Sequence, residues 1–277
     1  MIGGSGVFES LDILNFSMKF FTTILFSMGI FSFLFGQHLS DYEKRVFADG
    51  KGNLLNYRIL FPKNYNACTK YPLVLFLHGA GERGDNNQAQ LTHGGKLFLQ
   101  KKNRELYPAI VVFPQCPQED YWAHMVEKPR DGRRWREFPN AEEPGKALGL
   151  TMKLLKKLIV EQQVDLDRVY LMGLSMGGMG TFELLARMPE TFAAAVPICG
   201  GGNLKLAERY AGTTNLWIFL FVKDEVVLPE HSREMYAKLQ ALGANVRYTE
   251  FPDADHNSWD PAFAQPGLLE WLFSHRK

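Results

Sequence analysis

A serine flanked by glycines is the first group in the chain with the chemistry of a nucleophile. Residues 173–177 read Gly-Leu-Ser-Met-Gly, the pattern G-x-S-x-G. This pattern has meaning where a buried strand precedes it and a helix follows, because the serine then stands on a sharp turn with its hydroxyl exposed. The apolar stretch 169–174 and the helical pattern of 177–187 supply that context. Ser175 is therefore the candidate nucleophile, against the alternative of a glycine-rich turn with an incidental serine.

Two residues further along the chain can complete acid–base chemistry with this serine. Asp224 follows the apolar stretch 216–222, and His256 follows the stretch 246–251. The spacing leaves room for about one strand and one helix between successive members, so all three side chains can meet above one edge of a sheet. His256 would take the Ser175 proton and return it to the leaving group, and Asp224 would fix the imidazole tautomer.

Other acids and a second histidine compete for these roles. Glu225 is adjacent to Asp224 and is expected to point away from it, while Asp253 and Asp255 lie too close to His256 in sequence. His231 falls on a predicted helix and is interpreted as a surface residue. We therefore predict Ser175, Asp224 and His256 as the catalytic residues.

A second glycine-rich segment can stabilise negative charge. Residues 78–84 read HGAGERG and follow the apolar stretch 73–77, as does the loop that supplies an oxyanion donor in serine hydrolases. We expect the backbone N–H groups of Ala80 and Met176 to be the donors, with Gly81 as the alternative to Ala80. Phosphate binding fits poorly, because neither G-K-[ST] nor G-x-G-x-x-G is present. His78 is expected to brace the loop.

The elements that must position these residues alternate along the chain. Strands are predicted at 54–61, 73–77, 109–113, 169–174, 193–198, 216–222 and 246–251, and helices at 145–163, 177–187, 229–242 and 261–275. Residues 165–168 read as a turn. Such alternation predicts an α/β fold: a mostly parallel central sheet with helices on both faces.

The polar segment 115–144 is interpreted as a long connection carrying functional loops. Trp122 and Trp135 lie in it and Trp259 lies close to His256; all three are candidate substrate-binding residues, with packing as the alternative for the first two. A basic cluster in the segment either binds an acidic substrate, such as a glycan bearing uronic acid, or is a solvated loop; it comprises Lys128, Arg130, Arg133, Arg134 and Arg136.

Composition excludes several classes of protein. The 277 residues hold 31 Lys and Arg against 30 Asp and Glu, a net charge of +1 that argues against nucleic-acid binding. Three cysteines exclude a disulfide scaffold, and the absence of C-x-x-C disfavours a structural zinc site. No metal or cofactor is predicted. Spacing leaves open whether one pair forms a disulfide or none does among Cys68, Cys116 and Cys199.

The N-terminal segment is predicted not to belong to the fold. Residues 20–35 are apolar and uncharged, Lys19 precedes them and Gly36 follows, which is typical of a secretory signal peptide. The stretch is short for a membrane span. We divide the chain into 1–36, an extension and signal peptide starting at Met1 or Met18, and 37–277, the catalytic domain. The predicted location is secreted or periplasmic, with no membrane attachment after cleavage.

The segments HGAGERG, GLSMGG, KDEVVLP and DADHNSW, in this order, resemble the α/β-hydrolase superfamily. Over about residues 43–277 they are similar to its secreted esterase and predicted-peptidase group, which includes enzymes like polyhydroxybutyrate depolymerase and feruloyl-type carbohydrate esterases, and more distantly dienelactone hydrolases. The resemblance implies a serine esterase without metal or organic cofactor. One departure is Phe221-Val222-Lys223 before Asp224, where many relatives place His-Gly.

The predicted function is a secreted serine carboxylic-ester hydrolase working through an acyl-enzyme. A small-molecule or glycan ester is the expected substrate, with feruloyl or acetyl esters of plant polysaccharide as the leading class. Two alternatives stay open: a serine peptidase of the same fold, and a non-catalytic binding protein on a hydrolase scaffold. Oligomeric state is not determined by the sequence.

Overall fold

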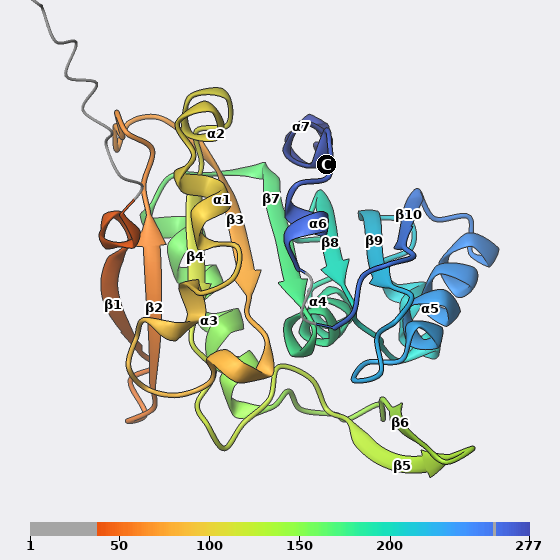
Figure 1. The fold of residues 1–277 in the computed structure, drawn as a ribbon. Coiled ribbons are helices and arrows are strands. Elements are labelled where there is room, and N and C mark those ends of the chain that lie inside the picture. Colours follow the sequence, from red (N-terminus) through yellow and green to blue (C-terminus); the bar gives the residue numbers. More distant parts are fainter. Residues whose placement is uncertain (1–37, 257–258) are drawn as a thin grey trace, which may run out of the picture. The chain divides into compact units, whose positions relative to one another are not determined.

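The predicted alternation of strands and helices builds one large sheet covered by helices (Figure 1). The computed structural model describes residues 38–256 and 259–277. Its strands are β1 Glu43–Ala48, β2 Leu54–Leu60, β3 Tyr71–Leu77, β4 Ile110–Pro114, β5 Val126–Arg130, β6 Arg133–Glu137, β7 Val164–Leu174, β8 Ala194–Ile198, β9 Asn215–Phe221 and β10 Val246–Phe251. Its helices are α1 Gly95–Leu99, α2 Lys101–Leu106, α3 Lys146–Glu161, α4 Met176–Arg187, α5 Pro229–Ala241, α6 Trp259–Phe263 and α7 Leu268–Ser274.

The main sheet is mostly parallel, as predicted. Within the described residues it has eight strands in the order β1-β2-β4-β3-β7-β8-β9-β10. Strands β1 and β2 pair antiparallel, as do β2 and β4, while the pairings from β4 through β3 to β10 are parallel. Parallel strands end at the same edge, so the loops after β3, β7, β9 and β10 gather there.

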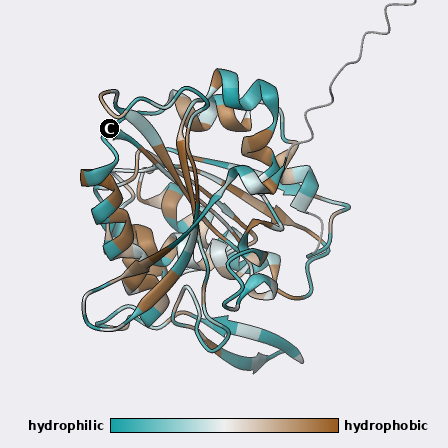
Figure 2. Ribbon diagram, turned by 90° about the vertical axis from the view of Figure 1, so that its left-hand side faces the viewer, coloured by the Kyte–Doolittle hydropathy of each residue, from teal (hydrophilic) through white to brown (hydrophobic). Residues whose placement is uncertain are grey.

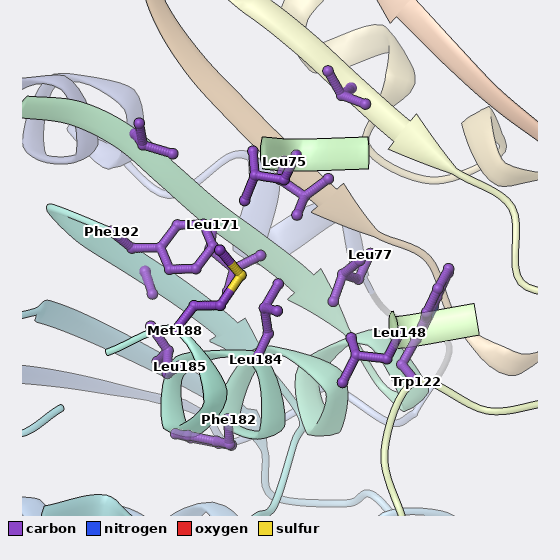
Figure 3. Close-up of a cluster of buried hydrophobic side chains, with 14 of the residues drawn as sticks. Leu75, Leu77, Trp122, Leu148, Leu171, Phe182, Leu184, Leu185, Met188 and Phe192 are labelled. Carbon is purple, nitrogen blue, oxygen red and sulfur yellow. The ribbon is translucent and has the colours of Figure 1, made fainter. Parts of the chain in front are cut away.

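Alternating side chains along the strands build a core on each face of the sheet. Leu73, Leu75 and Leu77 of β3 belong to the core that packs under α3, α4 and α5, whereas Val74 and Phe76 belong to the core under α1, α6 and α7. Figure 2 shows the sheet interior as predominantly hydrophobic, and Figure 3 shows the apolar side chains of α4 against β3 and β7. Both faces of β3 are buried, which explains its continuous run of apolar residues.

Three predictions about elements were wrong. The segment 115–144 was predicted to be a connection, but it carries the β5–β6 hairpin, which projects at the lower right of Figure 1. Residues 165–168, a predicted turn, belong to β7. The predicted terminal helix 261–275 is two helices, α6 and α7, because Pro266 and a left-handed Gly267 (φ 76°) interrupt it.

The N-terminal predictions are not tested. Residues 1–36, the predicted extension and signal peptide, lie outside the described residues, so the boundary at residue 37 stays a prediction. Among the residues that are described, no helix is both long and apolar enough to cross a membrane.

Candidate active site

Ser175 stands on a strained turn between β7 and α4. Its φ of 53° and ψ of −117° lie outside the ordinary helical and extended regions. The glycines around it permit the turn: a Cβ on Gly177 would meet the Leu77 carbonyl oxygen at 1.9 Å, and one on Gly173 would meet the Gly177 carbonyl oxygen at 2.2 Å. The G-x-S-x-G spacing is thus a steric requirement of strand and helix approaching this closely.

The three residues predicted as catalytic are brought together in one hydrogen-bonded chain. Ser175 Oγ lies 2.9 Å from His256 Nε2, and His256 Nδ1 lies 2.7 Å from Asp224 Oδ2. An ionised carboxylate only accepts hydrogen bonds, so Nδ1 carries the proton and donates it to Asp224. Nε2 is then free to accept the Ser175 hydroxyl proton, which is the arrangement that general-base activation of a serine needs.

Asp224 is held firmly by the loop after β9. Its side chain is 1% exposed, and Oδ1 accepts the backbone N–H groups of Val226 (2.9 Å) and Val227 (2.8 Å). The neighbouring Lys223 N–H donates to the Ala254 carbonyl (3.1 Å), which ties this loop to the one carrying His256. The competing acid Glu225 is exposed, and Asp253, 92% exposed, pairs with Lys223. The structure therefore favours Asp224 over these competitors.

The HGAGERG loop lies beside the turn that carries Ser175, because β3 pairs with β7 and Leu77 lies opposite Gly173. Ala80 opens a short 3-10 turn, Ala80–Glu82, and Met176 opens α4. Backbone N–H groups at the first residues of a helix have no acceptor within it. Ala80, Gly81 and Met176 all line the same pocket as Ser175. The backbone N–H groups predicted as oxyanion donors therefore lie in the pocket that holds Ser175.

His78 braces this loop from below. Its Nδ1 lies 2.7 Å from the Gly79 carbonyl oxygen, so it donates there, and its Nε2 accepts the backbone N–H of Cys116 at 2.9 Å. Burial lowers the pKa of His78 to about 4, so the ring is neutral at pH 7. Both ring nitrogens are occupied by backbone partners, which agrees with the predicted bracing role.

A pocket of about 270 Å³ opens over the hydrogen-bonded chain. Its lining comes from the HGAGERG loop, the end of β7 and the start of α4, the loops after β9 and β10, β6, α6, and the connections that hold His93 and Tyr121. The lining residues are Gly79, Ala80, Gly81, Glu82, His93, Tyr121, Arg136, Leu174, Ser175, Met176, Met179, Val226, Val227, His256 and Trp259. Sequence reasoning missed Glu82, His93, Met179 and the two valines. Glu82 had a signal, since it follows the predicted oxyanion residues directly.

Glu82 and His93 place a titratable pair inside the pocket. Glu82 Oε1 lies 3.6 Å from His93 Nε2, and the Glu82 side chain is only 12% exposed. Burial raises the pKa of Glu82, and the nearby His93 opposes that shift. The raised pKa of Glu82 favours its neutral form, which lowers the negative charge inside the pocket.

The three predicted substrate-binding tryptophans have different positions. Trp259 lines the pocket and stands edge-on to His256, with ring centres 5.0 Å apart. Trp122 is 0% exposed, packs beside Leu77 and Leu148 in Figure 3, and donates through Nε1 to the His78 carbonyl (3.1 Å). Its predicted contact with substrate is wrong, because a fully buried ring has no surface to offer. Trp135 lies outside the set of described residues that line the pocket.

The β5–β6 hairpin docks on the segment that follows Asp224. Trp135 packs against His231, with ring centres 4.1 Å apart, and the Arg136 backbone N–H approaches His231 Nε2 at 3.4 Å. His231 was predicted to be a surface residue, and this was wrong: it is 3% exposed. Burial, reinforced by the charge of Arg136, lowers the pKa of His231 to about 4.

The cysteines and acidic groups give no sign of a disulfide or a metal centre in the described residues. Cys68 is exposed, Cys116 and Cys199 are buried, and none of the three is paired. Burial raises the pKa of the Cys116 and Cys199 thiols, so both stay protonated. Across residues 38–256 and 259–277, no group of three or more His, Cys, Asp or Glu side chains is arranged to hold a metal ion.

Similar structures share the fold. A crystallised thermostable esterase superposes with a TM-score of 0.76 at 36% identity, over 86% of this chain and 64% of that one. A ferulic acid esterase from Anaeromyces mucronatus superposes with a TM-score of 0.61 at 14% identity, over 84% of this chain and 90% of that one. The second likeness shows the fold alone.

Comparison of the sequence with known proteins finds a similar peptidase and a matching family model. Dipeptidyl-peptidase 5 of Porphyromonas gingivalis is 26% identical over 166 residues, which are 60% of this chain and 22% of that protein. The chain thus spans about a fifth of this peptidase and just under two thirds of the thermostable esterase. The family model of the PHB depolymerase esterases matches residues 55–210, from β2 to the residue after the 3-10 helix Leu204–Arg209. This match covers more than half of the chain, which therefore belongs to the PHB depolymerase esterase family and has the α/β-hydrolase fold.

Proposed function

We propose that this protein is a secreted serine carboxylesterase with Ser175 as nucleophile, His256 as general base and Asp224 as the orienting acid. The observation that carries the proposal is the hydrogen-bonded chain of 2.9 Å from Ser175 Oγ to His256 Nε2 and 2.7 Å from His256 Nδ1 to Asp224 Oδ2. Ser175 stands at the N-terminus of α4, where the helix dipole favours negative charge. The family's esterases support the same class of reaction.

The reaction follows from these positions. His256 Nε2 takes the hydroxyl proton as Ser175 Oγ attacks the ester carbonyl, and the resulting oxyanion accepts the N–H groups of Ala80 and Met176. Collapse of the tetrahedral species breaks the bond to the alcohol oxygen, which leaves with the proton from His256. A water molecule then attacks the acyl-serine carbonyl and gives its proton to His256 Nε2. The bond between the acyl carbon and Ser175 Oγ breaks, Oγ takes the proton back from His256, and the carboxylic acid leaves. Asp224 keeps its hydrogen bond from His256 Nδ1 throughout and stabilises the imidazolium.

The substrate is proposed to be an acyl ester, of the feruloyl or acetyl type, on plant polysaccharide. The aromatic side chain of Trp259 beside the nucleophile supports a phenolic acyl group. The pocket, at about 270 Å³, has room for a small acyl group or a phenolic acid.

A direct assay tests the mechanism and the substrate class. The full chain and its Ser175→Ala variant are compared on 4-nitrophenyl acetate, 4-nitrophenyl butyrate and methyl ferulate. We expect turnover by the wild type and a fall in kcat of about 10⁴ or more in the variant. Ester turnover that survives in Ser175→Ala would contradict the serine mechanism, and a folded wild type that is inert on all esters would favour the binding-protein alternative.

A peptidase is the second candidate, because dipeptidyl-peptidase 5 is similar over 166 residues. The same hydrogen-bonded chain can cleave amides, so geometry does not separate the two activities. Dipeptidyl 4-nitroanilides, assayed beside the esters, distinguish them: we expect kcat/KM on the esters to exceed that on the anilides. The opposite order would favour the peptidase.

Secretion is proposed from the N-terminal segment 20–35, which lies outside the described residues. Expression of the full chain in a bacterial host, followed by cell fractionation and N-terminal sequencing, tests it. We expect an exported form that begins near Gln37. An uncleaved chain that stays with the membrane would show that the segment is an anchor.

A further inference from the structure

Arg136 is a buried cation in the wall of the active-site pocket. It lies on β6, its side chain is 7% exposed, and it lines the pocket together with Ser175 and His256. Nη2 pairs with Glu127 Oε1 at 2.8 Å, and Nη1 donates to the Val226 carbonyl. Nε is buried and has no hydrogen-bond partner within residues 38–256 and 259–277.

The unpaired Nε–H of Arg136 lowers the stability of the folded protein, which points to a functional reason for keeping it. Leaving a buried donor unpaired costs on the order of 1–3 kcal/mol, and more when the group is charged. Such groups are uncommon in native structures and are often found at functional sites. A guanidinium has five N–H donors; Glu127 and Val226 account for two, which leaves Nε–H and one hydrogen on each terminal nitrogen.

The surroundings hold Arg136 in place before any substrate arrives. Its backbone N–H is directed at the buried His231 (3.4 Å), and one terminal nitrogen is fixed by Val226, two residues after Asp224. A guanidinium positioned in this way loses little side-chain entropy when it binds a ligand. Arg136 therefore joins the pocket to the acid loop and is preorganised for recognition.

The local charge favours an anion. The hairpin segment Val126–Glu137 carries five basic residues against three acidic ones. Glu127, the partner of Arg136, also lies 4.0 Å from Arg134, so one carboxylate is shared between two guanidinium groups. Glu82, the one acid among the described residues that line the pocket, has a pKa raised by burial, which lowers its repulsion toward a second anion.

We infer that Arg136 binds a carboxylate on the substrate, so that the enzyme selects esters bearing a negative charge near the scissile bond. An arginine fork matches the two oxygens of a carboxylate better than those of an uncharged group. This inference rests on the proposed esterase function and deepens it: the substrate class becomes acidic esters, such as acyl groups on or from a uronate-bearing glycan.

Matched pairs of esters test the inference. One pair carries the charge on the acyl side (4-nitrophenyl hydrogen adipate against 4-nitrophenyl hexanoate), the other on the alcohol side (4-acetoxybenzoate against 4-acetoxybenzamide). In wild type, we expect the charged member of at least one pair to have the higher kcat/KM. In Arg136→Met this preference should fall about 10- to 100-fold, and in Arg136→Lys by less, since the charge stays but the fork is lost.

The ratio within a pair is independent of how much of each variant is folded, and Arg134→Gln is the matched control. Arg134 lies on the same hairpin and near the same Glu127, but its side chain is 68% exposed, so its substitution should leave the ratio unchanged. A wild type without preference in either pair overturns the inference, as does an equal loss on both members in Arg136→Met. Inactivity of the wild type on all four esters would instead count against the proposed function.

Discussion

At the scale of single residues, the proton inventory of the site depends on Asp224. Its two oxygens do different work: Oδ1 accepts two backbone N–H groups, and Oδ2 faces His256 Nδ1. A carboxylate can only accept at both positions. The charge of Asp224, and not merely its shape, therefore decides which nitrogen of His256 carries the proton.

Asp224→Asn tests that assignment. The amide oxygen can keep the two backbone bonds, but its NH₂ group would then face His256 Nδ1 and force the proton onto Nε2. We expect kcat to fall about 10³- to 10⁴-fold with little change in KM, because the imidazole can no longer accept the Ser175 proton. Steady-state kinetics on 4-nitrophenyl acetate measure this. Glu225→Gln, at an exposed neighbour, is the control and should behave as wild type.

Substitutions of Trp122 and Trp259 are expected to have different effects, on stability for Trp122 and on KM for Trp259. Trp122→Phe removes a buried Nε1–H to the His78 carbonyl and leaves that acceptor unpaired, at an expected cost of about 1–3 kcal/mol of unfolding free energy. Its KM for esters should stay at the wild-type value, since the ring lies outside the lining given for the described pocket. Trp259→Phe, in the pocket wall, should change KM instead. Urea unfolding and steady-state kinetics on both variants measure the two effects, and a KM change in Trp122→Phe would contradict the assignment.

Residue types and spacing were enough to predict Ser175, Asp224 and His256 as neighbours, because each follows a parallel strand of the same sheet, β7, β9 and β10 respectively. The same reasoning could not place Trp122 or Arg136. Whether an aromatic or basic residue in a polar segment faces the core, the pocket or the solvent depends on how that segment folds back. No local pattern records this.

At the scale of elements, the turn between β7 and α4 packs so closely on β3 that position 177 has no room for a side chain. A Cβ at position 177 would lie 1.9 Å from the Leu77 carbonyl oxygen, which belongs to β3. Neither that backbone nor the first turn of α4 can move without shifting the paired strands. The conformation of the turn between β7 and α4 is thus set by the packing of β3, β7 and α4 together.

Gly177→Ala is expected to disrupt this unit. Forcing a methyl group against strand backbone should lower the unfolding free energy by about 3 kcal/mol or more, beyond any direct effect on chemistry. Gly212→Ala is the control, because a Cβ there meets no atom within 4 Å among the described residues, and it should change stability by less than about 0.5 kcal/mol. Thermal and urea unfolding compare the two; equal stabilities would contradict the steric argument.

Buried strands were predictable and the hairpin was not, for a physical reason. Strands β3, β4 and β9 are buried on both faces and read as continuous apolar runs. The sequence of β5 is exposed along its whole length and is rich in charge, so it has no apolar period. Its signal was Asp131-Gly132, where both residues have positive φ (52° and 73°), as the turn between two paired strands requires.

At the scale of the whole molecule, the site sits where two separately packed cores meet the sheet edge. His256 and Trp259 come from loops and helices beside the core of α1, α6 and α7, while Met176 belongs to the core of α3, α4 and α5. Two neutral histidines help to fasten the loops at this edge: His78 under the HGAGERG loop, and His231 under the hairpin. Both lie outside the proposed acid–base steps.

These histidines predict how global stability depends on pH. Each has a folded-state pKa of about 4 against about 6.5 in the unfolded chain, so the unfolded chain binds protons that the folded one rejects between these values. Above about pH 6.5 both histidines are neutral in the folded and the unfolded chain, so they cost no stability. As the pH drops toward 4, the unfolding free energy falls, by on the order of 3 kcal/mol for His78 alone. Hydrogen bonds from Asn53 and Lys153 lower the pKa of Asp49. The contribution of Asp49 to the unfolding free energy is therefore lost only at more acidic pH.

Urea unfolding at pH 7.5, 6.0 and 4.5 measures this dependence as the unfolding free energy at each pH. We expect His231→Phe, which keeps an aromatic ring against Trp135, and His78→Gln each to flatten the fall between pH 6 and 4.5. His124→Gln, at a side chain bonded only to the Glu143 carbonyl in the described region, is the control and should keep the wild-type slope. If both test variants also keep that slope, the acid sensitivity comes from other groups, and the two histidines are not neutral fasteners of the active-site loops.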